Sequence, residues 1–325
     1  MAKATKSEVD ASSVPVEGKV EKATAHKPTT LTDVFTGLYN GYGEHGTDVG
    51  KKEFSTSLSK YLTEQLLSKY PDYKKYNLIF LFDNNTMVKS DADKIYNAVT
   101  KFSVKKPLLL ILLSRGGVAG SAYLIGKLCR EYCNDKFTIV VPRYAKSAAT
   151  LICCAADEIH MGSLSELGPI DPQIDDMPAL GLKNAIEHIA QLVKDNPSSS
   201  EMFAKYLKYS VEPISLGYYE RVAESAMQYA EKLLLTHAAH LPKTAKNIAN
   251  DLVYKYKDHG FVIDKAEAEE IFGKEIIKMN TTEYEIGNFV YRTLDFIRTL
   301  ADGLGYVFYY IGSLETEPSL IAKKK

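Results

Sequence analysis

Short apolar segments alternate with helical ones in the first half of the chain, and this alternation constrains the fold more than any other feature. A strand that is apolar almost throughout is buried on both faces, and helices between such strands predict parallel crossovers. The sequence therefore predicts an α/β fold here. The expected strands are NLIFLF (77–82), LLLILL (108–113), FTIVVP (137–142) and IHMG (159–162).

Changes in composition along the chain predict four regions. Residues 1–28 mix small, charged and proline residues without an apolar core, which is typical of a disordered tail. Residues 29–75 have helical spacing and form a lead-in, and residues 76–275 form the main domain, with long helical segments from about residue 178 onward. Residues 276–325 hold a C-terminal helix and a possible strand at YVFYYI (306–311).

The overall charge and the cysteines exclude several classes of protein. A net charge of −1 gives no global attraction to nucleic acid or to an anionic membrane. We recognise no signal peptide, and the apolar run PLLLILL is too short to span a bilayer. We expect a cytoplasmic protein without a transmembrane segment, a metal or a cofactor. Buried free thiols are expected at Cys129, Cys133, Cys153 and Cys154.

The segment SRGGVAGSAYLIGKL follows the second strand and begins with two glycines, Gly116 and Gly117. Glycines let a backbone turn its N–H groups toward a ligand, and the helix that follows adds positive potential. A dinucleotide-binding loop is the rival interpretation, but the spacing is not GxGxxG and no ribose-binding acid ends the next strand. The pattern favours an oxyanion-binding loop, with a plain tight turn as the alternative.

The segment PRYAKSAATLICCAADEIHMG places Ser147 at the start of a helix after the third strand. Serine is common there because its hydroxyl can accept a backbone N–H. Small neighbours leave room for a substrate carbonyl, however, and the N–H of Ala148 could then face a developing oxyanion. One helix and one strand later, SELGPIDPQ presents Asp171 on a proline-flanked, extended loop, as a catalytic acid or as a turn-stabilising residue.

These three segments, in this order, resemble the serine dehydrogenase proteinase family of Clp-like serine peptidases, which are related to signal-peptide peptidase A and have a crotonase-type fold. A later segment, HGFVIDKAEAEEIFG (259–273), is similar to the one that closes that fold. The resemblance covers about residues 75–275. It implies ββα units wound into a superhelix, with a C-terminal half of long helices.

The resemblance also implies a serine endopeptidase that forms an acyl-enzyme on peptides or unfolded proteins. Ser147 would be the nucleophile, and the N–H groups of Gly116 or Gly117 and of Ala148 would form the oxyanion hole. The fold implies a homo-oligomer. Two alternatives stay open: an inactive or regulatory peptide-binding member of the same fold, and a crotonase-type enzyme acting on acyl-CoA.

The general base is the least defined part of this hypothesis. A lysine base, as in signal-peptide peptidases, needs a buried amine with a lowered pKa. Of Lys183, Lys194 and Lys205 we favour Lys183, because PALGLKNAIEHIA sets it in an apolar helix start and so predicts a Ser-Lys dyad.

Histidine and aspartate offer a second solution for the base. A Clp-type arrangement would imply a histidine and then an aspartate after the serine, but the loop about 25 residues after Ser147 offers Asp171 and no histidine. Asp171, and His259 in the closing segment, are the alternative base or orienting group. His160 lies on a predicted strand and is expected to be packed, and His237 and His240 are expected to be structural.

Overall fold

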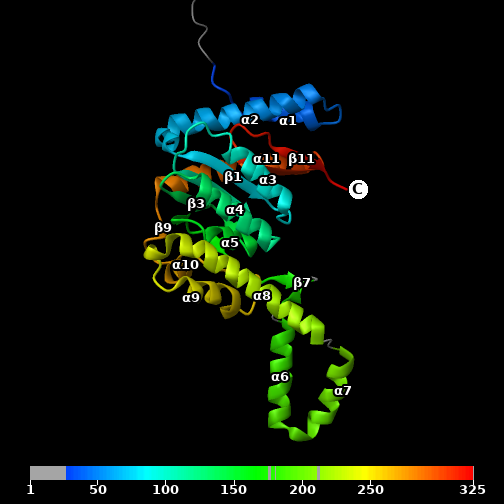
Figure 1. Cartoon of the computed structure of the whole chain (residues 1–325). Helices are drawn as coiled ribbons and strands as arrows, with labels where there is room; N and C mark the ends of the chain where they lie inside the picture. The colour runs from blue at the N-terminus through cyan, green and yellow to red at the C-terminus, as the bar shows by residue number, and fades with distance from the viewer. Residues whose placement is uncertain (1–26, 175–176, 180, 211–212, 325) are drawn as a thin grey trace, which may run out of the picture.

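The computed structural model describes residues 27–174, 177–179, 181–210 and 213–324, so the region predicted as a tail lies almost wholly outside the described residues. Its centre is a mixed sheet with helices on both faces (Figure 1). The α/β class is confirmed. The four predicted strands are present and run parallel, in the order β1 (Asn77–Asp83), β2 (Leu108–Ser114), β3 (Phe137–Val141) and β5 (Glu158–Met161).

Alternate residues of the central strands enter two different apolar cores. Ile79 and Leu81 pack on one side of the sheet, whereas Leu78, Phe80 and Phe82 pack on the other. Side chains of a strand alternate between the two faces, so strands covered on both sides must be apolar at every position. This is why the strands were recognisable as continuous runs.

The first core lies under the crossover helices. These are α3 (Lys89–Val99), α4 (Ala119–Tyr132) and α5 (Ala148–Cys153). The second core lies under the lead-in and the C-terminal helix, that is α1 (Leu31–Tyr42), α2 (Asp48–Lys69) and α11 (Thr282–Gly303). The predicted lead-in is therefore a helical hairpin that covers the sheet, with the short 3₁₀ turn η1 (Pro71–Lys75) leading into β1.

Several short strands were not expected from the sequence. β4 (Tyr144–Ala145) pairs with the end of β2 and with β6 (Glu166–Leu167), and both lie off the main order of the sheet. The order β3–β4–α5 is a ββα unit, as the resemblance implied. The strand expected at 306–311 is β10 (Tyr306–Ser313), which pairs antiparallel with β1, and the remaining strands are β7 (Gln173–Ile174), β8 (Met177–Pro178), β9 (Ile277–Lys278) and β11 (Ser319–Ala322).

The predicted C-terminal half of long helices is also present. α6 (Gly181–Asp195) and α7 (Ser200–Ser210) project away from the body, and α8 (Pro213–Leu234) returns to it (Figure 1). None of the described side chains of α6 and α7 is buried. The other elements are η2 (Pro197–Ser199), η3 (Leu235–His240), α9 (Ala245–Asn250), the π-turn η4 (Asp251–Lys255) and α10 (Lys265–Phe272).

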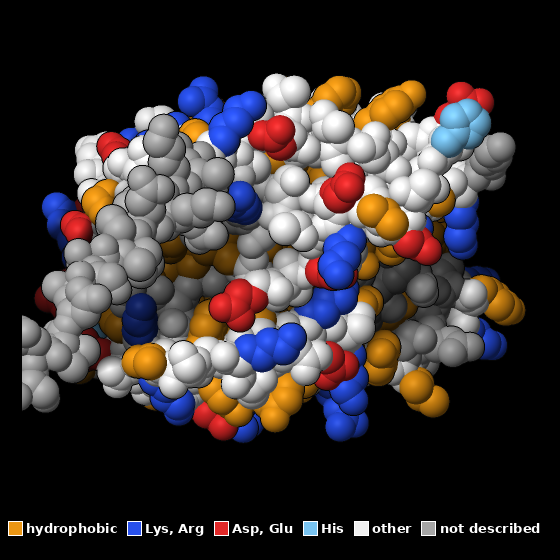
Figure 2. Space-filling view, turned by 90° about the horizontal axis from the view of Figure 1, so that it is seen from above, with side chains coloured by type: hydrophobic (Ala, Val, Ile, Leu, Met, Phe, Trp, Pro, Cys, Tyr) orange, Lys and Arg blue, Asp and Glu red, His pale blue; other side chains and the backbone are white. Residues whose placement is uncertain are grey.

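The length and hydropathy of the helices and the charge of the surface bear on contact with membranes and nucleic acids. Within the described residues, no helix combines the length and the apolar character that crossing a membrane requires. Acidic and basic side chains are interspersed on the face seen from above (Figure 2). This view therefore shows no large patch of a single sign of charge.

Candidate active site

The double-glycine turn after β2 lies against the start of α5. Gly116 and Gly117 have φ angles of 97° and 151°, which only glycine adopts readily. A Cβ on Gly116 would lie 2.6 Å from the carbonyl oxygen of Lys146 and 2.8 Å from the nitrogen of Ala148. The absence of a side chain at Gly116 is thus what allows this turn and the Ser147 segment to approach each other.

The hydrogen bonds of this turn distinguish between the two glycines. The N–H of Gly116 donates to Ser114 Oγ at 3.1 Å. Met87 bridges the turn, since its N–H donates to the Gly116 carbonyl and its own carbonyl accepts from Val118. Among the described residues the N–H of Gly117 has no acceptor, so Gly117 is the better oxyanion donor of the two.

Ser147 does not act as an ordinary helix cap. It precedes α5 with φ 51° and ψ −119°, and its hydroxyl makes no capping hydrogen bond. A positive φ is rare outside glycine and costs about 1–3 kcal/mol, so it is found mainly where surrounding structure enforces it, often at functional sites. The conformation favours the nucleophile interpretation of this serine over the capping interpretation.

A cavity of about 590 Å³ brings the sequence motifs together. Gly117 and Ser147 lie on one side of it, and Ala148, the first residue of α5, has an N–H without an intrahelical acceptor. Other lining residues come from the segment after β6, from α8 and from the segment between η4 and α10. They include Ile170, Pro172, Gln173, Val222, Ala226 and His259.

Asp171, Gln173 and His259 form a polar cluster beside this cavity. Gln173 and His259 line the cavity itself, whereas Asp171 lines the neighbouring small cavity that Lys183 also lines. Nδ1 of His259 lies 3.7 Å from Oδ2 of Asp171. Nε2 of Gln173 lies 3.0 Å from Nδ1 of His259 and 2.9 Å from Oδ2 of Asp171. Asp171 is buried, and its Oδ1 has no hydrogen-bond partner among the described residues. A buried carboxylate beside a histidine can stabilise an imidazolium, which suits a general base.

Lys183 does not line the cavity that contains Ser147. Its Nζ forms a half-exposed ion pair with Glu220 at 3.0 Å, and it lines a separate small cavity that does not include Ser147. The hydrogen bond and the charge of Glu220 raise the pKa of Lys183, whereas a lysine base needs a lowered pKa. The geometry therefore gives no support to the favoured base. Lys194 is exposed as well, and Lys205 pairs with Glu201 at the surface.

Lys146 joins the Ser147 segment to the segment that carries His259. Its Nζ donates to the carbonyls of Leu167 and Phe261, both at 3.2 Å, and pairs with Glu166 at 3.3 Å. Leu167 also forms a β-bridge with Ile263. These contacts hold the loop of residues 259–263 against β6, and direct Lys146 away from the cavity.

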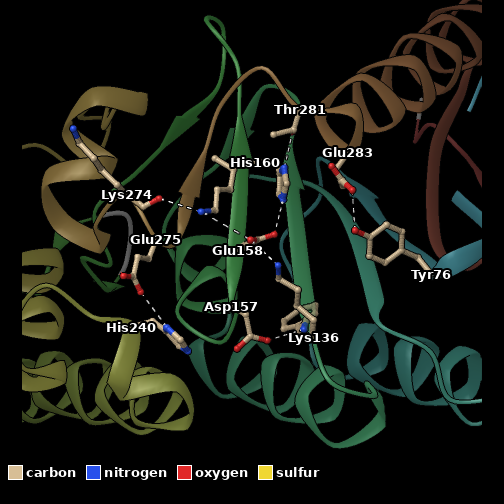
Figure 3. Close-up of polar contacts among 12 residues, drawn as sticks. Tyr76, Lys136, Asp157, Glu158, His160, His240, Lys274, Glu275, Thr281 and Glu283 are labelled. Carbon is tan, nitrogen blue, oxygen red and sulfur yellow. Dashed lines mark hydrogen bonds and ion pairs between the residues drawn. The ribbon is translucent and has the colours of Figure 1, made fainter. Parts of the chain in front are cut away.

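Three further histidines, His160, His237 and His240, lie outside the cavity. His160 is buried, and its ring lies 2.7 Å from Thr281 Oγ1 and 3.3 Å from a carboxylate oxygen of Glu158 (Figure 3). His240 pairs with Glu275 at the surface, and His237 is buried. The expectation of a packed His160 is confirmed. The described residues hold no group of three or more histidine, cysteine and carboxylate side chains placed to bind a metal.

With this geometry established, the chain can be compared with known proteins. Residues 79–200 match the family model of ClpP-like SDH-type serine proteinases. The match confirms the resemblance drawn from the motifs, and supports a serine peptidase at the level of the family. It includes Gly117, Ser147 and Asp171 but ends before His259.

Two uncharacterized proteins of Methanocaldococcus jannaschii are similar to part of the chain. MJ1495 is 34% identical over 105 residues, and MJ0137 is 36% identical over 97 residues, which are 32% and 30% of this chain. The chain spans about a third of the length of these curated relatives, 36% and 34% respectively.

Two solved structures of mutants of the membrane-bound stomatin-specific protease 1510-N are also similar to the chain. The first is 13% identical and covers 68% of this chain and 85% of its own, with a TM-score of 0.40. The second, in complex with a substrate peptide, is 12% identical and covers 76% and 88%, also with a TM-score of 0.40.

The sequence patterns did not predict that Gln173, or Val222 and Ala226 of α8, would line the cavity. Gln173 stands in the quoted SELGPIDPQ, two residues after Asp171, and that position was the available signal. Val222 and Ala226 carry no such signal, because the sequence of a long amphipathic helix does not show which of its apolar residues line a cavity.

Proposed function

We propose that this protein is a serine endopeptidase in which Ser147 attacks the peptide carbonyl and forms an acyl-enzyme. The observation that carries the proposal is the conformation of Ser147, held at positive φ against Gly116 in a cavity that His259 also lines. The match to a family of serine proteinases supports it. No cofactor is required for this chemistry.

In the proposed mechanism His259 is the general base, in place of Lys183. Gln173 Nε2 donates to Nδ1 of His259 in this structure, so the mechanism requires the other tautomer, in which Nδ1 carries the proton and turns from Gln173 to Asp171. Nε2 of His259 then takes the hydroxyl proton as Ser147 Oγ bonds to the carbonyl carbon, and the N–H groups of Gly117 and Ala148 donate to the resulting oxyanion. The imidazolium is stabilised by Asp171, whose Oδ2 lies 3.7 Å from Nδ1. His259 then protonates the leaving amine as the C–N bond breaks, and water hydrolyses the ester by the reverse sequence.

The remaining features of the proposal concern the substrate and the setting. We propose peptides or unfolded proteins as substrates, a crotonase-type superhelix, and a homo-oligomer in the cytoplasm. The ββα unit of β3, β4 and α5 supports the fold. All four cysteines are free, and burial raises the pKa of the Cys129 thiol, which supports an unreactive structural role in a reducing compartment.

Labelling with a fluorophosphonate probe and cleavage of casein test the nucleophile. We expect the wild type to be labelled and active, Ser147→Ala to lose both properties, and Ser90→Ala to keep both, because Ser90 is exposed on α3 away from the cavity. If the wild type binds casein but is not labelled by the fluorophosphonate and does not cleave casein at any pH, the proposal is contradicted and the inactive peptide-binding alternative is favoured.

The base is tested by three further variants. His259→Ala should lower kcat/KM by about a thousandfold, and Asp171→Asn should lower it by a smaller factor, since a general base contributes about 10²–10⁴-fold. Lys183→Met should change kcat/KM little. The opposite ranking, with Lys183→Met the most severe, would restore the Ser-Lys dyad.

A further inference from the structure

Arg115 is a cation without a partner in the wall of the Ser147 cavity. It follows β2 directly and is exposed, and its side chain forms no ion pair, hydrogen bond or ring contact with any other described residue. A guanidinium carries five N–H donors in one plane, a geometry that matches the two oxygens of a carboxylate. The cavity therefore offers an unused cation to a molecule that binds beside Ser147.

Carboxylates are missing from the described wall of this cavity. Of the described residues that line it, only Arg115 carries a fixed charge. Asp171 lines the neighbouring small cavity instead. Asp83, at the end of β1, is buried, and its Oδ1 accepts from the N–H and the Nδ2 of Asn85 at 2.8 and 2.7 Å. A cavity lined by one sign of charge concentrates ligands of the opposite sign, so this one favours anionic groups.

Asn84 adds a second donor to the same wall. β1 and β2 are parallel with Asp83 beside Ser114, so Asn84 and Arg115 follow paired residues of neighbouring strands, and both line the cavity. The hydroxyl of Tyr144 donates to Oδ1 of Asn84. This contact fixes the amide so that its Nδ2, which has no acceptor among the described residues, is free to donate to a ligand.

We propose that Arg115, assisted by Asn84, binds a carboxylate of the substrate and makes the peptidase selective for acidic peptides. The proposal rests on the proposed peptidase function, to which it adds the charge that the site selects. A neutral peptide that covers Arg115 removes water from the guanidinium without replacing it, whereas a carboxylate supplies charged hydrogen bonds. The carboxylate belongs either to an aspartate or glutamate side chain or to the C-terminus of the substrate, and paired substrates distinguish the two.

Peptide pairs that differ only in charge measure this preference. The parent is a neutral fluorogenic peptide, acetylated and amidated, in which glutamate replaces glutamine at one position at a time. At one position near the cleaved bond, kcat/KM should be about five- to tenfold higher with glutamate, more than at an open surface because water is partly excluded. The same parent with a free C-terminus, compared with its amide, tests the second source of the carboxylate.

Variants assign the preference to the proposed residues. Arg115→Met should bring the ratio of the two kcat/KM values to about one. Asn84→Asp should do the same, because it keeps an acceptor for Tyr144 but places an anion beside Arg115. Arg292→Met is the matched control, since Arg292 is exposed on α11 and outside the cavity, and it should keep the wild-type ratio. Each ratio compares two peptides on one variant, so a loss of folded protein does not alter it.

The failure of this proposal differs from the failure of the peptidase proposal. Ratios near one for every pair in the wild type, or a preference that persists in Arg115→Met, would overturn the carboxylate site while Ser147-dependent cleavage remained. Binding of the same labelled peptides to Ser147→Ala, followed by fluorescence anisotropy, should show the acidic preference without catalysis, and adding Arg115→Met should abolish it. If the peptides bind with this preference but the wild type cleaves none of them, the carboxylate site stands and the peptidase proposal fails.

Discussion

At the scale of single residues, the backbone of Ser147 is the most informative feature. Its φ of 51° places a serine where glycine would be relaxed. Such a conformation persists only when the surroundings enforce it, and here the start of α5 and the close contact of Gly116 do so. The strained backbone and the proposed nucleophile are therefore the same residue.

This strain gives a stability prediction. Ser147→Gly should be more stable than Ser147→Ala by about 1 kcal/mol, because glycine removes the steric cost of a positive φ whereas alanine retains it. Urea denaturation of the two variants measures the difference, and neither should react with a fluorophosphonate. Equal stability of the two would show that this backbone is not strained.

His237 gives a pH dependence of folding. Burial lowers its pKa from about 6.5 to about 4. Between these values the unfolded chain binds a proton that the folded chain does not, so stability is complete above about pH 6.5 and falls as the pH falls toward 4.

Replacing His237 should remove this part of the pH dependence. From about pH 7 to about pH 4.5, the wild type should lose about 2–3 kcal/mol more unfolding free energy than His237→Gln does, as urea denaturation at the two pH values would measure. The same loss in His237→Gln and the wild type would assign the effect to other groups.

At the scale of elements, the turn between β2 and α4 is tightly packed at Gly117, the residue whose N–H is proposed to bind the oxyanion. A Cβ on Gly117 would lie 2.4 Å from the nitrogen of Met87 and 2.5 Å from its carbonyl oxygen. Both are backbone atoms, so no side chain can rotate to make room. The turn must move if Gly117 is replaced, and the N–H proposed for the oxyanion hole moves with it.

Gly117→Ala should therefore lower both stability and activity. We expect a loss of about 2 kcal/mol in unfolding free energy and at least about a hundredfold in kcat, the effect of removing one oxyanion donor. Gly120→Ala is the matched control on α4. Apart from its chain neighbours and the nearby backbone of its own helix, no described atom lies within 4 Å of its Cβ position, so this variant should gain about 0.5–1 kcal/mol from helix propensity and keep its activity. Full activity in Gly117→Ala would remove Gly117 from the oxyanion hole.

The elements themselves were predicted where hydrophobic periodicity was strong. β1, β2 and β3 match the expected runs to within a residue or two, because both of their faces are buried. The two-residue strands β4 and β6 were missed, since so short a segment has no period. Among the long helical segments expected after residue 178, α9 ends at Asn250 and continues as the π-helical turn η4, a change for which the local sequence gives no signal.

At the scale of the whole molecule, the lead-in, the sheet and the C-terminal helix share one apolar core. Leu62 of α2 is fully buried in it, together with Phe80 of β1 and Leu294 of α11. Segments that are far apart in the sequence therefore stabilise each other, and we expect the lead-in to unfold together with the sheet.

Truncation of Leu62 tests this coupling. Leu62→Ala should lower the free energy of unfolding by about 3 kcal/mol in a single transition, because it leaves a cavity in the shared core. Val49→Ala, on the same helix but 69% exposed, should change it by less than about 0.5 kcal/mol. An early, separate transition of α1 and α2 in Leu62→Ala, followed by circular dichroism and tyrosine fluorescence, would show that the lead-in folds independently.

The sequence by itself determined the α/β class, the double-glycine turn and Ser147 as a candidate nucleophile, because periodicity and turn chemistry act over a few residues. Only the tertiary structure decided which of the candidate bases lines the cavity of that serine. Lys183 is 36 residues from Ser147 in the chain and pairs with Glu220, whereas His259, 112 residues away, lines the same cavity. The reason is physical: the contact between β6 and Ile263 closes a long loop, and local sequence patterns carry no record of such contacts.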